Sequence, residues 1–127
     1  MKIYRISEKE YPLAGSEVSG LKIAQDIPNT GSIPSSINNY EILSGIREVP
    51  LSDFDLTGKS YSVSENERIK HLSKEITMNG WISPLIVVID RDGPYILEGG
   101  HRAEALYRLN VFSLPALIVK DKDNEDI

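Results

Sequence analysis

The five consecutive residues Glu98–Arg102, Glu-Gly-Gly-His-Arg, combine residue types that bind and react with phosphate groups. They follow a predicted strand and open a predicted helix, whose first-turn N–H groups and dipole attract anions. The two glycines let the backbone approach a ligand closely, and Arg102 offers a planar fork that can hold a phosphate at two points. His101 can donate a hydrogen bond or move a proton near neutral pH. The pattern predicts a phosphate-sized anion site, although two glycines before a helix also form ordinary turns.

The carboxylate of Glu98 at the start of this motif loop (Glu98–Arg102) has two interpretations. It can hold Mg²⁺ or accept a proton, which makes Glu98 the candidate metal ligand and Glu98 and His101 the candidate catalytic residues. It can equally be a strand-end carboxylate that caps the next helix. The sequence has only two histidines and no cysteine, so it excludes disulfides, thiolate metal sites and a cysteine nucleophile.

The elements that must position this loop are predicted from hydrophobic spacing after residue 45. A capping-box spacing at Ser64 and Glu67, followed by apolar residues at helical intervals, predicts a helix that ends at Asn79-Gly80. The unbroken β-branched run at 85–89 predicts a central strand covered on both faces. In order, we expect an edge strand at 46–51, a helix at 65–78, a hairpin of strands at 85–89 and 95–97, a helix from Ala103 to about Asn110, and a strand at 116–119 after Pro115.

The chain has the size and composition of one globular domain, with 127 residues of which 40% are hydrophobic. We expect an N-terminal extension (1–45) of loops packed on a domain (46–120), with Leu21, Ile23 and Ile27 helping to cover the central strand, and a charged tail (121–127). A loosely ordered arm is the alternative for 1–45. The fold class is therefore α/β (α+β), a small mixed sheet with helices.

The charge and hydropathy patterns restrict the classes of partner. The sequence has 14 lysines and arginines against 19 aspartates and glutamates, for a net charge of -5, which disfavours a large DNA footprint. No stretch approaches the roughly 20 apolar residues of a membrane-spanning helix, and the first residues lack the apolar run of a secretory signal. We expect a cytoplasmic protein with no membrane partner.

Residues 46–119 resemble the ParB and sulfiredoxin superfamily. The matching pieces are Val49-Pro50-Leu51, Met78-Asn79-Gly80, the turn and strand at 82–87, and the motif loop. Partition proteins place Gly-Glu-Arg-Arg at the positions of 99–102, sulfiredoxins place Gly-Gly-Cys-His-Arg at 98–102, and a free-serine kinase has Asp-Gly-His-His-Arg there. The resemblance implies a ParB/sulfiredoxin-like fold.

The resemblance also implies that the motif loop binds nucleotide phosphates, most simply those of ATP or another NTP with Mg²⁺. The nucleotide-binding residues would then be Gly99, Gly100, His101 and Arg102, joined by Ser83 from the turn before the central strand. Arg47 and Lys59 lie where superfamily members often supply a cation, although each is more often an ordinary surface residue. Trp81 would flank a nucleobase, although a place in the core is more usual for tryptophan.

Function stays open between several classes, because this superfamily includes reductases, kinases, NTPases and nucleases. Sulfiredoxin chemistry is excluded because Gly100 stands at the position of its cysteine. The remaining hypotheses are an NTPase or phosphotransferase, a non-catalytic module that contacts a protein partner through the N-terminal extension, and a ParB-like nuclease or DNA-associated protein. The negative net charge and the lack of a helix-turn-helix segment after residue 120 make sequence-specific DNA recognition improbable.

Overall fold

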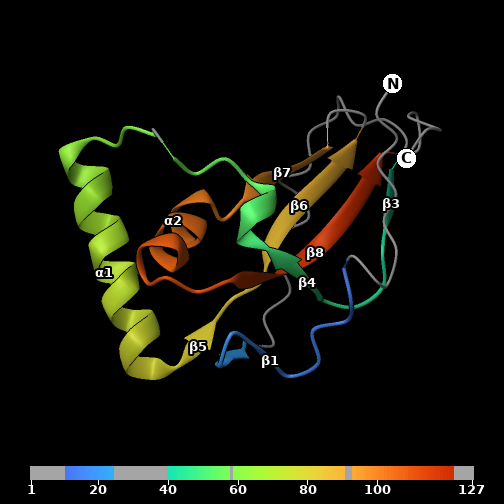
Figure 1. The fold of residues 1–127 in the computed structure, drawn as a ribbon, viewed down its shortest axis with the longest axis horizontal. Coiled ribbons are helices and arrows are strands. Elements are labelled where there is room, and N and C mark those ends of the chain that lie inside the picture. Colours follow the sequence, from blue (N-terminus) through green and yellow to red (C-terminus); the bar gives the residue numbers. More distant parts are fainter. Residues whose placement is uncertain (1–10, 25–39, 58, 91–92, 122–127) are drawn as a thin grey trace.

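The computed structural model describes residues 11–24, 40–57, 59–90 and 93–121. Figure 1 shows the arrangement of its helices and strands. They are β1 (Glu17–Val18), β2 (Leu21–Ile23), β3 (Tyr40–Ile42), β4 (Arg47–Pro50), the 3₁₀ helix η2 (Leu51–Asp53), α1 (Val63–Asn79), β5 (Trp81–Ile82), β6 (Leu85–Asp90), β7 (Gly93–Glu98), α2 (Gly100–Arg108) and β8 (Ser113–Asp121). The combination of helices with mixed sheets confirms the predicted α+β class.

The larger of the two sheets has five strands and is mixed. β6 lies between β8, which it pairs in parallel, and β7, which it pairs antiparallel. On its other side β8 pairs antiparallel with β3 and β4. Each residue from Leu85 to Ile89 is at most 1% exposed. The predicted hairpin and central strand are therefore confirmed.

The strand β8 begins before Pro115, which corrects the prediction that it follows this proline. Pro115 lies opposite Glu48 of β4, and the parallel pairing with β6 begins only at Ala116. Proline has no N–H to donate, so it is tolerated just before the position where that second ladder starts.

The helices α1 and α2 pack together on one face of this sheet (Figure 1). Alternate residues of β6 point to opposite faces, as the two-residue repeat of a strand requires. Leu85, Val87 and Ile89 join the buried cluster that contains residues of both helices, whereas Ile86 and Val88 form a second buried cluster with Val119. Both faces of the strand are buried, as its β-branched composition predicts.

The start of α1 lies two residues before the predicted start. The Ser62 side chain, rather than that of Ser64, caps the helix and accepts from the Glu65 N–H at 3.1 Å, while the Ser62 N–H donates to Glu65 Oε1 at 3.2 Å. The spacing Ser-x-x-Glu occurs twice in this segment, and the first copy is the one with an extended backbone at the serine. The predicted end is confirmed, since Gly80 adopts a left-handed φ of 72°.

The N-terminal segment contributes strands where loops were expected. β1 and β2 pair antiparallel, and β2 pairs in parallel with β5 to make a second, three-stranded sheet. Tyr11 and Val18 are 1% and 2% exposed, and Leu21 packs against the main core cluster. Ile27 lies outside the described residues. The pairing was not predictable locally, because β5 is about 60 positions away from β2 and each strand has only two or three residues.

No helix in the described part of the chain is long and apolar enough to cross a membrane.

Candidate functional site

The motif loop joins β7 to α2, and Gly100 at the start of that helix is exposed. Gly99 is the N-cap with φ 102° and ψ 22°, and no side chain caps the helix start. A Cβ on Gly99 would lie 2.5 Å from Leu85 Cγ, so both its backbone angle and its packing require glycine. A Cβ on Gly100 would meet no heavy atom within 4 Å. The backbone at the start of α2 is therefore open to a ligand.

Arg102 fixes the turn before β6 to the first turn of α2. Its Nη1 donates to the carbonyl oxygens of Ser83 at 3.1 Å and Pro84 at 3.0 Å. Burial lowers the pKa of the guanidinium from its ordinary value, and the nearby carboxylate of Glu98 opposes that shift. The group remains a cation, since arginine titrates far above neutral pH. A positive charge is thus held beside the open helix start.

His101 is connected to the start of α1. Its Nε2 lies 3.2 Å from Glu65 Oε2, and its ring meets the ring of Tyr61 edge-on with centroids 6.1 Å apart. The backbone N–H of Ser62 lowers the pKa of Glu65, and the hydrogen bond from His101 adds to this. Sequence reasoning missed Glu65 and Tyr61. The capping-box spacing at Ser62 was a signal for Glu65, but nothing local places that helix start beside the motif loop.

A pocket of about 210 Å³ adjoins the loop on the side of β5. Trp81, Ser83 and Arg102 are among the residues that line it. Trp81 is 48% exposed, and Lys22 Nζ of β2 lies 5.7 Å from its ring centre. A place for Trp81 in the core, which sequence reasoning favoured, is therefore wrong. Its exposure follows from its position on a short strand whose next residue, Ile82, points inward and is buried.

Residues 38–127, more than two thirds of the chain, match the model of the ParB N-terminal domain. The chain belongs to the ParB N-terminal domain family. The suspected membership of the ParB/sulfiredoxin superfamily is thereby confirmed. None of the curated proteins compared with the chain matches it. The family match of this ParB N-terminal domain includes the motif loop but not β1 and β2.

The predicted site residues of this ParB N-terminal domain divide into two groups. Those brought together around the start of α2 are Ser83, Glu98, Gly99, Gly100, His101 and Arg102. Arg47 is not among them, because it is buried on β4 and donates to the carbonyl oxygens of Tyr11 at 3.2 Å and Ser44 at 3.3 Å. Its guanidinium therefore connects β4 to the backbone at Tyr11 and Ser44. Lys59 is exposed in the connection from η2 to α1, two residues before Tyr61.

The described residues of the ParB N-terminal domain include no group of three histidines, aspartates or glutamates arranged to hold a metal ion. Glu98 lies at the end of β7, opposite Ile86. A single carboxylate still fits Mg²⁺, which commonly takes one or two protein carboxylates and completes its shell with phosphate oxygens and water. Glu98 could therefore hold the ion only together with a phosphate ligand.

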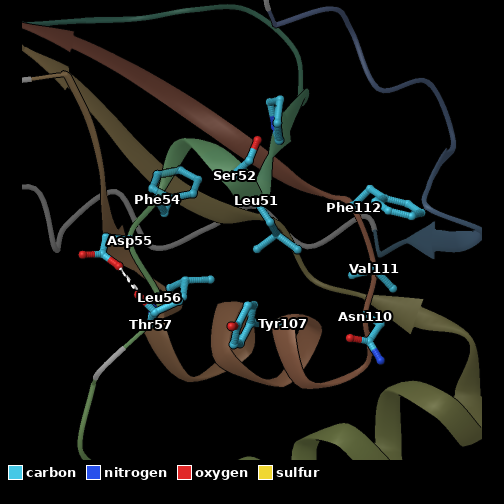
Figure 2. A pocket seen from close by; sticks show the side chains of 11 residues that line it. Leu51, Ser52, Phe54, Asp55, Leu56, Thr57, Tyr107, Asn110, Val111 and Phe112 are labelled. Atoms are coloured by element: carbon cyan, nitrogen blue, oxygen red, sulfur yellow. Dashed lines mark hydrogen bonds between the residues drawn. The ribbon is translucent and has the colours of Figure 1, made fainter.

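The larger cavity of the domain, about 660 Å³, lies at the other end of α2 (Figure 2). It is lined by Pro50, Leu51, Ser52, Phe54, Asp55, Leu56, Thr57, Tyr107, Asn110, Val111 and Phe112. Leu51 and Leu56 are buried, whereas Phe112 is 87% exposed. Asp55 is the one charged residue of this lining, and its Oδ1 accepts from the N–H and the hydroxyl of Thr57. The sequence suggested no site here, because the residues come from two separate, weakly patterned segments.

Proposed function

We propose that this ParB N-terminal domain binds the phosphate groups of a nucleoside triphosphate, most simply ATP, at the first turn of α2. The observation that carries the proposal is the uncapped helix start at Gly99 and Gly100 beside the guanidinium of Arg102. A phosphate site typically combines N–H groups at a helix start, glycines that leave the backbone accessible, and an arginine.

Each group would have a separate role in binding. The N–H groups of the first turn would donate to phosphate oxygens, and Arg102 would supply the main positive charge. Partial burial of Arg102 strengthens that interaction because less water screens it. Glu98 would hold Mg²⁺, which offsets the charge of the phosphates when it is bound.

Turnover of the nucleotide is the catalytic form of this proposal. Water or a hydroxyl acceptor would attack the terminal phosphorus, so that the domain acts as an NTPase or a phosphotransferase. Phosphoryl transfer needs positioning and charge stabilisation more than covalent chemistry. The loop offers those through its N–H groups, Arg102 and a Glu98-bound ion, while His101 is the candidate group for proton transfer.

Calorimetric titration with each common NTP and Mg²⁺ tests binding, and two substitutions at Gly100 locate it. Gly100→Asp places a negative charge in open space at the helix start, where it favours the helix but repels phosphate. Gly100→Asn has nearly the same shape without the charge. We expect at least a tenfold loss of affinity in Gly100→Asp beyond that of Gly100→Asn, with both variants folded. Absence of heat for every NTP, or equal affinities in the two variants, contradicts the proposal.

Removal of the arginine gives a second measurement. A charge-assisted hydrogen bond contributes on the order of 1.5 to 3 kcal/mol, so Arg102→Ala is expected to weaken binding about tenfold or more. Arg108→Ala is the matched control on the same helix, because Arg108 Nε donates to Glu104 rather than to the turn at Ser83. Equal losses in both variants would mean that the effect is structural.

Binding of a protein partner is the second candidate function, favoured by the cavity in Figure 2. Phe112 stands 87% exposed at its edge and, together with the apolar lining of the cavity, offers a surface on which an apolar side chain of a partner could pack. The test compares proteins cross-linked to Phe112→Ser and Gly100→Asp in cell extract. A partner lost only in Phe112→Ser supports this function, and identical partners in both variants contradict it.

A further inference from the structure

The contact between His101 and Glu65 defines the state of the imidazole. Their side chains are 36 residues apart in sequence, and the Nε2 to Oε2 distance is 3.2 Å. The pKa of Glu65 is lowered, so its carboxylate is ionised at neutral pH and can only accept hydrogen bonds. Nε2 of His101 must therefore carry the hydrogen. In the neutral ring Nδ1 is then the nitrogen with a free electron pair.

The carboxylate that makes this contact is itself fixed. Glu65 Oε1 accepts from the N–H of Ser62 at 3.2 Å, so one oxygen caps α1 and the other meets His101. The ring of Tyr61 lies edge-on to the imidazole, with the ring centroids 6.1 Å apart. These contacts bring the start of α1 and the start of α2 together at the motif loop.

The other histidine provides a contrast within the same chain. His71 Nε2 lies 2.9 Å from Glu75 on the same helix, and the two side chains are 73% and 53% exposed. Such an exposed pair one turn apart contributes little and is easily replaced by water. The His101 and Glu65 side chains are 31% and 44% exposed and belong to different elements. Of these two pairs, the second is the one that adjoins the proposed phosphate site.

We propose that Glu65 is a positioning residue for His101, and that His101 accepts the proton of the attacking water or hydroxyl group during phosphoryl transfer at the motif loop. This inference rests on the proposed function. Glu65 holds the Nε2–H form of the ring, which leaves Nδ1 as the proton acceptor. In the step, the acceptor oxygen forms a bond to the terminal phosphorus of the NTP and its proton passes to Nδ1. The bridging P–O bond breaks, and the nucleoside diphosphate leaves with the electron pair.

The test of positioning does not need a nucleotide. Imidazole ¹⁵N spectra of the full chain report which ring nitrogen carries the hydrogen, in the parent and in Glu65→Gln. Glutamine can still form the capping box, so α1 is retained while the charged acceptor is lost. We expect the His101 signals to move from the Nε2–H form toward a mixture and the His71 signals to stay unchanged. Unchanged His101 signals in Glu65→Gln overturn the positioning role.

The test of proton transfer measures phosphate release or transfer from an NTP with Mg²⁺. We expect turnover to fall about a hundredfold in His101→Gln and about tenfold in Glu65→Gln, and nucleotide affinity to stay nearly unchanged in Glu65→Gln. Glu67→Gln, an exposed position on α1 that loses the same charge, is the control and should keep the parent rate. Equal rates in parent and Glu65→Gln, or binding without any turnover in the parent, overturn the catalytic step. Failure of the parent to bind any NTP refutes the proposed function, and the ¹⁵N result then still decides the positioning.

Discussion

At the scale of single residues, the two adjacent glycines of the motif loop serve different purposes. Gly99 has a left-handed backbone and lies against Leu85, so its role is to let β7 turn into α2. Gly100 faces open space, so a side chain there would meet no neighbour, and the proposed phosphate site uses that space. The sequence predicted correctly that this loop joins a strand to a helix. It could not distinguish the two glycines, because the side chain that packs against Gly99 belongs to another strand.

Substitution at Gly99 is expected to destabilise the fold. Gly99→Ala brings a Cβ to 2.5 Å from Leu85 Cγ and forces alanine into a φ of 102°. Backbone strain of this kind costs about 1 to 3 kcal/mol, and the contact with Leu85 adds to it. Urea denaturation measures the loss, with Gly100→Ala as the control. Alanine at that helical position should leave the free energy of unfolding unchanged or raise it. Equal stabilities of the two variants would contradict the assignment.

Arg102 and Arg47 show why site residues were only partly predictable. Both are arginines near expected strands or turns. The motif loop predicted Arg102 as a phosphate ligand, whereas Arg47 was a candidate only through the family resemblance, with an ordinary surface residue as the alternative. Arg102 lies at the open helix start, whereas Arg47 donates to the backbone at Tyr11 and Ser44. The difference depends on the path of the N-terminal segment, which local patterns do not determine.

At the scale of elements, α1 connects helix capping to the site. Ser62 and Glu65 cap the start of the helix through reciprocal hydrogen bonds between side chain and backbone, and the Glu65 carboxylate also contacts His101. The helix itself and its glycine stop were predictable from hydrophobic spacing. Its first residue was not, because two overlapping Ser-x-x-Glu patterns compete and only the backbone conformation distinguishes them.

Two serine substitutions test which pattern caps the helix. Ser62→Ala removes the acceptor of the Glu65 N–H and is expected to cost about 1 kcal/mol of stability. Ser64→Ala lies inside the first helical turn and should change stability by less than about 0.5 kcal/mol. Chemical denaturation of both variants gives the comparison. A larger loss of stability in Ser64→Ala than in Ser62→Ala would support Ser64 as the capping residue, as the sequence predicted.

The lowered pKa of Glu65 predicts a dependence of stability on pH. A carboxyl whose folded pKa lies below its unfolded value stabilises the fold when ionised, and that stabilisation is lost as pH falls through the folded pKa. The unfolding free energies of the parent and Glu65→Gln should therefore differ most at neutral pH. The difference should shrink as pH falls below the ordinary value of 4.5, where the parent carboxyl becomes neutral as well. A difference that stays constant into the acid range contradicts this assignment.

At the scale of the whole molecule, residues 11–24 near the N-terminus contribute to the core. The Tyr11 side chain is 1% exposed, its hydroxyl donates to Asp53 at 2.7 Å, and its carbonyl accepts from Arg47. β2 pairs in parallel with β5, which lines the pocket of about 210 Å³ beside the motif loop. Sequence reasoning expected this segment to pack on the domain but missed its strands, since their partners are remote in the chain.

Truncation of the Tyr11 side chain measures how much its packing in the core contributes to the stability of the fold. Tyr11→Ala is expected to cost about 3 to 5 kcal/mol, as for other large buried aromatic residues, whereas Tyr11→Phe loses only a hydrogen bond, about 1 kcal/mol. Thermal or urea unfolding of the full chain provides both numbers. If Tyr11→Ala were as stable as the parent, the segment would not belong to the core.

The helix α2 connects the two candidate sites of the molecule, with the motif loop at its start and the cavity of Figure 2 at its end. The two proposed functions therefore differ in which end of one helix a ligand contacts. The position of a bound nucleotide along α2 tests the first function, and the position of a bound protein partner tests the second.

The most direct measurement is a titration of the ¹⁵N-labelled full chain with ATP and Mg²⁺, followed by backbone amide NMR. Phosphate binding at the start of α2 predicts that the largest shifts occur at the amides of 99–102, and that they are lost in Gly100→Asp but kept in Gly100→Asn. Shifts confined to the cavity around Tyr107 and Phe112, or no shifts with any nucleoside triphosphate, would contradict the account.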